Sequence, residues 1–202
     1  MFKIAVLLSG SGTNLQNIID NIKNKTLNAE IKVVISDRKN SYGITRAENE
    51  GIKTFILDRK VYKTELSDKI YEIVENEKVD LIVLAGFLSI IKGKILKTYK
   101  NKIINIHPSL IPSFCGDGMY GLKVHQEVLK YGVKITGCTV HFVDEGTDTG
   151  KIILQKPFII DKEYTAEELQ KDVLKLEYEA MIEALKIVGS INSLNWLMLV
   201  LM

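Results

Sequence analysis

Short apolar runs alternate with amphipathic stretches along almost the whole chain. Strand-like runs rich in aliphatic residues occur at Ile4–Leu8, Ile31–Ile35, Lys53–Leu57, Leu81–Leu84, Ile103–Ile106, Ile135–Val143 and Ile152–Ile160. Helical patterns fall between and after them, at Asn14–Lys23, Tyr42–Asn49, Lys63–Asn76, Gly121–Leu129 and Ala166–Val188. Repeated strand–helix–strand units require a sheet covered by helices, because right-handed crossovers place helices over its faces. The pattern therefore predicts a Rossmann-like α/β fold, with a mostly parallel twisted sheet and helices on both faces.

The last two strand-like runs break this pattern, because the loop between them has no helical periodicity. We expect some antiparallel pairing there. The final helix opens with Thr165 and Glu168 at capping-box spacing. Nothing in the composition resembles a linker, so residues 1–188 are expected to form one domain. Residues 189–202 form an apolar tail of unassigned role, which is shorter than the ~20 residues that span a bilayer.

Composition excludes several classes of function. The chain has 202 residues, a formal net charge of +2 and scattered lysines, which is unlike the basic stripe of a nucleic-acid-binding protein. Two cysteines, Cys115 and Cys138, give neither a disulfide framework nor metal-ligand spacing. The apolar run after Met1 is too short for a signal peptide. We expect a cytoplasmic protein with no membrane or nucleic-acid partner.

A glycine-rich segment, SGSGTN at Ser9–Asn14, follows the first strand directly. Glycines permit a tight turn and close approach of the backbone to a ligand. The helix that follows directs free amides and its positive dipole end at the loop, so a phosphate is the natural occupant. The segment lacks the third glycine of a dinucleotide fingerprint and the Gly-Lys-Ser/Thr of a Walker loop, which favours a phosphomonoester. A purely structural turn would use the same glycines.

A second motif, NIHPS at Asn105–Ser109, ends the fifth strand-like run. Asn105 and His107 are two residues apart, so both side chains leave the same face of the strand. Imidazole exchanges a proton near neutral pH, and a carboxamide can donate to a developing oxyanion. Together they suit acyl or formyl transfer, although a lone histidine is often only structural.

Two further segments carry candidate groups. The loop Asp144–Gly150 contains aspartates that could hold a nearby imidazole, although such loops are often solvated turns. His141 lies in the preceding strand with no adjacent amide donor in the sequence, and we interpret it as structural. The segment LAGFLSII at Leu84–Ile91 could form a flat pocket for an aromatic ring, or simply pack in the core.

Taken in order, these segments resemble the phosphoribosylglycinamide formyltransferases, a folate-dependent formyltransferase family. The resemblance runs from Met1 to about Ile187 and rests on SGSGTN, LAGF, NIHPS, and TVHFV followed by an Asp-x-Gly element. It implies the formyltransferase fold. It also implies transfer of a formyl group from 10-formyltetrahydrofolate to the amine of glycinamide ribonucleotide in purine synthesis. We expect no metal ion, because the histidine and the carboxylate do not converge at ligand spacing with a third partner, and a monomer or homodimer.

The resemblance also implies roles for individual residues. Asn105, His107 and Asp148 would be catalytic, with Asn105 and a protonated His107 stabilising the oxyanion and Asp148 supporting the imidazolium. The other implied residues bind the two substrates. They are Gly12, Thr13, Asn14 and Glu177 for the nucleotide, and Lys63, Leu88, Ser89, Ile90, Ile91 and Asn105 for the folate, with the loop 144–148 closing over the pterin.

The chain departs from the family pattern at a few positions. Ser89 stands where a basic residue is frequent, Tyr178 replaces a usual histidine, and Met181-Ile182 replaces a common Tyr-Pro. The loop Cys115–Tyr120 is lengthened. These departures put a charged contact with the folate at position 89 in doubt and leave the catalytic trio intact.

Three alternatives remain. Methionyl-tRNA formyltransferase carries a further tRNA-binding domain, which we do not expect in a chain of 202 residues. Formyltetrahydrofolate hydrolase carries an additional amino-terminal domain and lacks the phosphate loop. A non-catalytic nucleotide-binding protein of the same fold is expected to have lost the trio, which is present.

Overall fold

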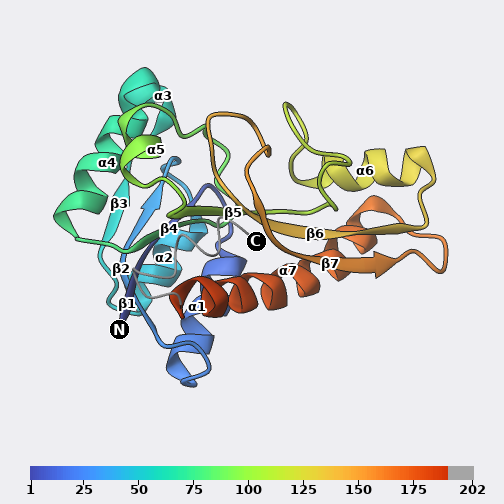
Figure 1. The fold of residues 1–202 in the computed structure, drawn as a ribbon, viewed down its shortest axis with the longest axis horizontal. Helices are drawn as coiled ribbons and strands as arrows, with labels where there is room; N and C mark the ends of the chain where they lie inside the picture. Colours follow the sequence, from blue (N-terminus) through green and yellow to red (C-terminus); the bar gives the residue numbers. More distant parts are fainter. Residues whose placement is uncertain (191–202) are drawn as a thin grey trace.

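The apolar runs of the sequence assemble into one seven-stranded sheet. The computed structural model describes residues 1–190, and its strand order is β3-β2-β1-β4-β5-β6-β7 (Figure 1). The strands are β1 (Phe2–Leu8), β2 (Ala29–Ser36), β3 (Thr54–Ile56), β4 (Leu81–Leu84), β5 (Ile103–His107), β6 (Ile135–Phe142) and β7 (Ile152–Ile159). Strands β1 to β5 pair in parallel, whereas β6 is antiparallel to both β5 and β7. The expected fold and the antiparallel pairing at the end of the chain are both confirmed.

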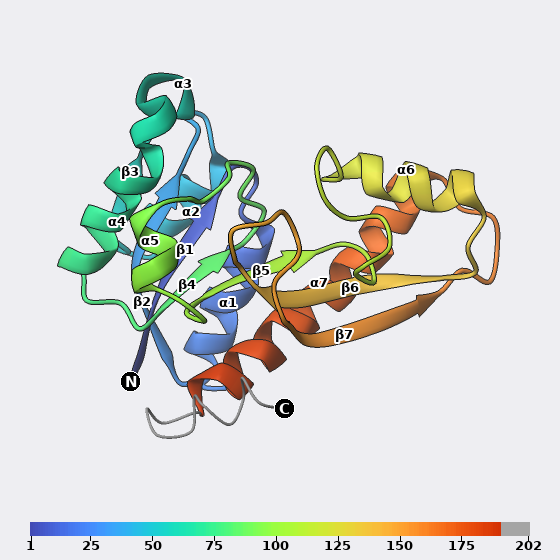
Figure 2. The ribbon, with the colours of Figure 1, turned by 45° about the horizontal axis from the view of Figure 1, so that its top comes forward.

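Helices cover the two faces of the sheet (Figure 2). They are α1 (Thr13–Lys23), α2 (Tyr42–Asn49), α3 (Arg59–Tyr62), α4 (Leu66–Asn76), α5 (Lys94–Thr98), α6 (Leu122–Tyr131) and α7 (Ala166–Gly189), with a short 3₁₀ turn at Lys63–Glu65. Buried residues of β1 alternate between two hydrophobic clusters, as the period of two requires. One cluster includes α1, α2, α6 and α7, and the other includes α4 and α5.

The observed starts of two helices can be compared with those expected from the sequence. Thr165 accepts from the backbone N–H of Glu168, and the Glu168 carboxylate accepts from that of Thr165, so the expected capping box is confirmed. The single helix expected at Lys63–Asn76 is wrong at its start. Lys63 has a φ of 44°, which an α-helix cannot accommodate, and α4 begins only at Leu66. Helix α5 was not expected from the sequence.

Two further expectations concern the C-terminal tail and a membrane span. Of the expected tail 189–202, residues 191–202 lie outside the part that the structure describes. Within residues 1–190, no helix is both long enough and apolar enough to cross a bilayer.

The strand order reverses between β1 and β4, which are neighbours in the sheet. Loops that leave such a pair of strands diverge to opposite faces, and the crevice between them is where open α/β sheets bind ligands. The backbone N–H of Ser9, just after β1, donates to the carbonyl of Gly86, just after β4. The two expected binding segments therefore meet at the carboxyl ends of the strands.

Candidate active site

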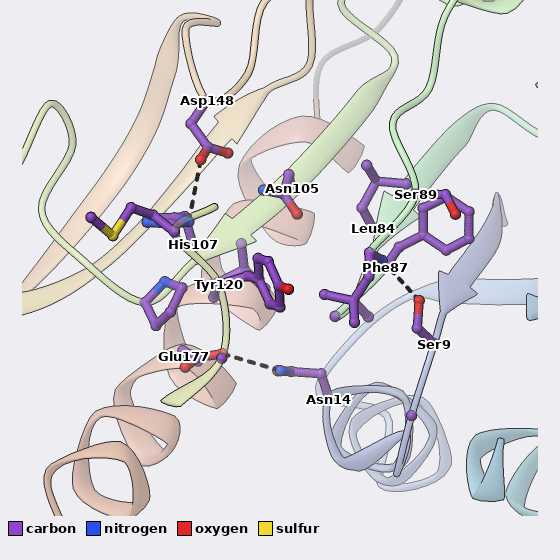
Figure 3. A pocket seen from close by; sticks show the side chains of 18 of the residues that line it. Ser9, Asn14, Leu84, Phe87, Ser89, Asn105, His107, Tyr120, Asp148 and Glu177 are labelled. Carbon is purple, nitrogen blue, oxygen red and sulfur yellow. Dashed lines mark hydrogen bonds and ion pairs between the residues drawn. The ribbon is translucent and has the colours of Figure 1, made fainter. Parts of the chain in front are cut away.

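A cavity of about 780 Å³ opens at the carboxyl ends of the central strands. Its lining includes residues from the loops after β1, β4 and β5, from the loop between β6 and β7, and from α6 and α7 (Figure 3). The chain has three histidines, and His107, His125 and His141 all line this cavity. The cavity has the size of a small-molecule site.

The glycine-rich loop forms one end of the cavity. Gly12 is the N-cap of α1 and has a φ of 70°. A Cβ at Gly12 would lie 2.5 Å from the Cα of Gly43, so a side chain there would meet α2. Arg46 on α2 donates from Nε to the carbonyl of Ser11 at 2.9 Å. The loop is therefore held closely against α2, while Gly12, Thr13 and Asn14 face the cavity.

Glu177 on α7 lies beside this loop. Asn14 donates from Nδ2 to Oε2 of Glu177 at 3.3 Å, across 163 residues of sequence (Figure 3). Glu177 is buried, and burial raises its pKa to about 7, although the hydrogen bond from Asn14 opposes the shift. The Asn14 Oδ1 atom is also buried and accepts no hydrogen bond within the described residues. This end of the cavity thus offers backbone amides, an amide oxygen and a carboxyl group that titrates near neutrality.

Residues 88–91 form a second wall of the cavity. Leu88, Ser89, Ile90 and Ile91 all line it. The segment is fixed at two points: the Leu88 N–H donates to Oγ of Ser9 at 2.8 Å, and Oγ of Ser89 donates to Oδ2 of Asp37 at 2.5 Å. Asp37 is fully buried, and Nη1 of Arg59 lies 3.7 Å from Oδ2 of Asp37. Ser89 therefore points toward a buried carboxylate rather than supplying a charge to the cavity.

His107 ends β5 and lies between two oxygen acceptors. Its Nε2 donates to the carbonyl of Phe114 at 2.9 Å, and its Nδ1 lies 3.5 Å from Oδ2 of Asp148. Burial lowers the pKa of His107, although the Phe114 carbonyl and the Asp148 carboxylate oppose the shift. The lowered pKa favours the neutral ring before substrates bind, whereas both acceptors are placed to stabilise an imidazolium. The protonated His107 expected from the family resemblance stays a prediction.

Asp148 lies in the loop between β6 and β7, at a φ of 58°. Burial alone would raise its pKa, but contacts with His141, the Gly116 N–H and His107 together lower it below its usual value. The Gly116 N–H donates to Oδ2 of Asp148 at 3.0 Å. The carboxylate is thus ionised and positioned beside both imidazoles.

Asn105 faces His141, which lies directly opposite it in the antiparallel register of β5 and β6. The Phe142 carbonyl, 2.8 Å from Nδ1 of His141, can only accept, so Nδ1 carries the proton. Nε2 of His141 lies 3.2 Å from Nδ2 of Asn105 and 3.6 Å from Oδ1 of Asp148, so it faces both side chains. The interpretation of His141 as a residue with no amide donor beside it is wrong, because cross-strand pairing supplies that donor.

The structure thus brings together Asn105, His107, Asp148, the glycine loop, Glu177 and residues 88–91. It does not bring Lys63 to them: Lys63 is exposed and does not line the cavity. Three contributors were missed by sequence reasoning, namely the Gly116 N–H, His141 as a partner of Asn105, and His125. His125 lies in an amphipathic helix, where a polar residue gives no signal of its burial.

Comparisons with known proteins identify a family for the chain. A model of the formyl transferase family, described as "Formyl transferase", matches residues 2–185. The chain is 37% identical over 195 residues to phosphoribosylglycinamide formyltransferase of Bacillus subtilis, covering 96% of this chain and 97% of that protein. It is 43% identical over 190 residues to the trifunctional purine biosynthetic protein adenosine-3 of Gallus gallus, covering 93% of this chain but only 18% of the length of that longer relative.

Solved structures show the same likeness in three dimensions. Phosphoribosylglycinamide formyltransferase of Bacillus halodurans superposes with a TM-score of 0.86 at 33% identity, covering 93% of this chain and 95% of that one. Glycinamide ribonucleotide transformylase 1 of Symbiobacterium toebii gives a TM-score of 0.85 at 40% identity, covering 92% and 86%. Fold and sequence therefore indicate the same family.

Proposed function

The chain belongs to the formyl transferase family, and we propose that it transfers a formyl group from 10-formyltetrahydrofolate to the amine of glycinamide ribonucleotide. The products are the N2-formyl nucleotide and tetrahydrofolate, in purine synthesis. One observation carries the proposal. A single cavity is lined by the glycine loop Gly12–Asn14 at the start of α1, by the Asn105, His107 and Asp148 side chains, and by the wall at residues 88–91.

The two substrates are assigned to different parts of this cavity. Gly12, Thr13 and Asn14 would hold the phosphate through free amides at the start of α1, where the helix dipole favours an anion. Glu177 would accept from a sugar hydroxyl. Leu88 to Ile91, with Asn105, would bind the folate, with the loop 144–148 over its pterin ring. The assignment of Lys63 to folate binding stays a prediction, and Lys63 does not line the cavity.

The transfer would begin with attack of the glycinamide amine on the formyl carbon, which gives a tetrahedral intermediate. Asn105 Nδ2–H would donate to its oxyanion. The proton of the attacking amine would pass, by way of a water or Asp148, to Nδ1 of His107, because Nε2 already donates to the Phe114 carbonyl. Asp148 and that carbonyl would then stabilise the imidazolium. Return of that proton to the departing folate nitrogen would release the products. No step in this scheme requires a metal ion.

The wider setting of the reaction is also a proposal. Both ligands are small molecules, and we place the reaction in the cytoplasm, by a monomer or a homodimer whose catalytic domain is residues 1–188. Formyltetrahydrofolate hydrolysis, and nucleotide binding without catalysis, are alternatives that the same fold permits.

The test is release of deformylated folate from a 10-formylfolate, followed by absorbance with and without glycinamide ribonucleotide. We expect product only when the nucleotide is present. Equal release without the nucleotide would indicate a hydrolase, and no release in either case would overturn the proposed reaction.

A further inference from the structure

His125 on α6 is a buried histidine with no hydrogen-bonding partner among the described residues. Its side chain is 1% exposed, and neither Nδ1 nor Nε2 has a partner. Buried polar groups are nearly always paired, because an unpaired one has lost its hydrogen bonds to water without replacement. His125 is also a residue of the cavity lining. Its two ring nitrogens are thus unpaired at the wall of a ligand-sized cavity.

The surroundings of His125 determine what chemistry it can offer. Burial, with a smaller contribution from the nearby His107, lowers the pKa of His125 to about 4. The ring is therefore neutral at physiological pH and presents one donor and one acceptor. A neutral ring is poorly suited to hold a phosphate. It matches a hydroxyl or an amide, each of which can both donate and accept.

The packing of α6 indicates which substrate His125 faces. Helix α6 packs against α7, which carries Glu177, and the buried residues Val124 of α6 and Val173 of α7 belong to the same hydrophobic cluster as those of α1. The folate wall at residues 88–91 joins the other cluster through Ile91, next to Phe87. His125 therefore lies on the side of the sheet that supplies Asn14 and Glu177.

From this geometry we propose that His125 is a nucleotide-binding residue that hydrogen-bonds an uncharged hydroxyl or amide group of glycinamide ribonucleotide. The proposal rests on the proposed function for the identity of the nucleotide. It adds to the cavity a third polar contact for that substrate, next to Glu177 and the loop at Gly12–Asn14.

The experiment compares KM for each substrate in the wild type and in the H125L, H125Q and V124A variants. We expect His125→Leu to raise KM for the nucleotide about 10- to 100-fold with KM for the folate unchanged, and to unfold at the same or a higher denaturant concentration. His125→Gln, which keeps a donor and an acceptor, should recover part of the loss. Val124→Ala perturbs the packing of the same helix without removing a polar group, and should lower stability with no selective change in nucleotide KM.

A second readout works even where the leucine variant folds poorly. Only three imidazole side chains are present, so ¹⁵N-histidine NMR of the wild-type protein reports on each of them. Saturating glycinamide ribonucleotide without folate should shift the His125 nitrogens. Unchanged His125 signals at saturation, or an unchanged nucleotide KM in a folded leucine variant, would overturn the inference. If the wild type is active, either result leaves the proposed function standing, whereas an inactive wild type would refute the proposed function itself.

Discussion

The two ends of the cavity each hold a carboxyl group, and their environments shift the two pKa values in opposite directions. Glu177, at the end proposed to bind the nucleotide, is buried with one hydrogen bond from Asn14, and its pKa rises to about 7. Asp148, at the end where formyl transfer is proposed (the transfer end), contacts His107, His141 and the Gly116 N–H, and its pKa falls below the usual value. Burial by itself raises the pKa of both carboxyl groups. The number of charge-stabilising partners decides which carboxyl is ionised.

This difference implies a division of roles. An ionised carboxylate beside an imidazole can stabilise a charge that appears only during the reaction, and so acts on kcat. A carboxyl group that is partly protonated near pH 7 can donate to a sugar oxygen as well as accept from a hydroxyl, and so acts on ground-state binding. Replacing each carboxyl by its amide separates these two effects.

The largest effect is expected at the transfer end. Asp148→Asn should lower kcat by roughly 10²–10⁴-fold, because the amide cannot stabilise the imidazolium of His107. The matched variant at the other end, Glu177→Gln, should change KM for the nucleotide more than kcat. Steady-state kinetics of both variants measure the contrast. Full turnover by Asp148→Asn would remove the basis for the assigned roles.

The next largest effect is expected in the pH dependence of the free energy of unfolding, through Glu177. The folded pKa of about 7 lies above the unfolded value near 4.3, so the folded state binds the additional proton. The favourable contribution is complete below about pH 4 and is lost as pH rises through 7. Relative to Glu177→Gln, the wild type should therefore lose on the order of 3 kcal/mol of unfolding free energy between pH 4 and pH 8.

Asp148 should change the free energy of unfolding with pH in the opposite direction to Glu177. Its folded pKa is lowered, so its contribution is present above the unfolded pKa and is lost as pH falls through the folded value. Urea unfolding of wild type, Glu177→Gln and Asp148→Asn from pH 8 to below pH 4 checks both signs, because the Asp148 contribution is lost only at the acid end. Parallel pH curves for wild type and Glu177→Gln would show that Glu177 is not desolvated as described.

A smaller effect is expected in the glycine loop. Gly12→Ala must hold a Cβ at a φ of 70° and within 2.5 Å of the Gly43 Cα, so it should cost about 2 kcal/mol of stability and raise nucleotide KM about tenfold. Gly10 is the control, since a Cβ there meets nothing within 4 Å and its φ is not in the left-handed region. Gly10→Ala should unfold like the wild type. Equal denaturation midpoints for the two variants would contradict the role of the Gly12–Gly43 contact.

The smallest effect is expected at the folate wall. Ser89→Ala removes the hydroxyl that donates to buried Asp37, and loss of a hydrogen bond to a charged group costs about 1–3 kcal/mol. Because Ser89 belongs to the wall itself, KM for the folate should rise about fivefold while KM for the nucleotide stays constant. A change in both constants together would mean that the Ser89–Asp37 contact supports the whole fold rather than this wall.

The part of the site that could be predicted from the sequence is the part encoded locally. The glycine loop, its strand and its helix are contiguous, so Gly12 to Asn14 could be placed from their order alone. Asn105 and His107 were likewise predicted to share a face because they are two residues apart on one strand.

The rest depends on register and on backbone conformations that periodicity does not encode. His141 faces Asn105 because β6 runs antiparallel to β5 with those residues opposite, and a slip of one residue would turn His141 to the other face. The break at Lys63 reflects a positive φ within an otherwise helical pattern. His125 sits in an amphipathic helix, where only packing against α7 reveals that its ring is buried.

The central claim is that this one cavity joins the two substrates and moves a formyl group between them. The most direct test supplies 10-formyltetrahydrofolate labelled with ¹³C in the formyl group, together with glycinamide ribonucleotide, and analyses the products by mass spectrometry. The predicted result is one labelled formyl group on the nucleotide for each folate deformylated, with roughly 10²–10⁴-fold slower transfer by Asp148→Asn. Labelled formate beside an unchanged nucleotide would contradict the claim.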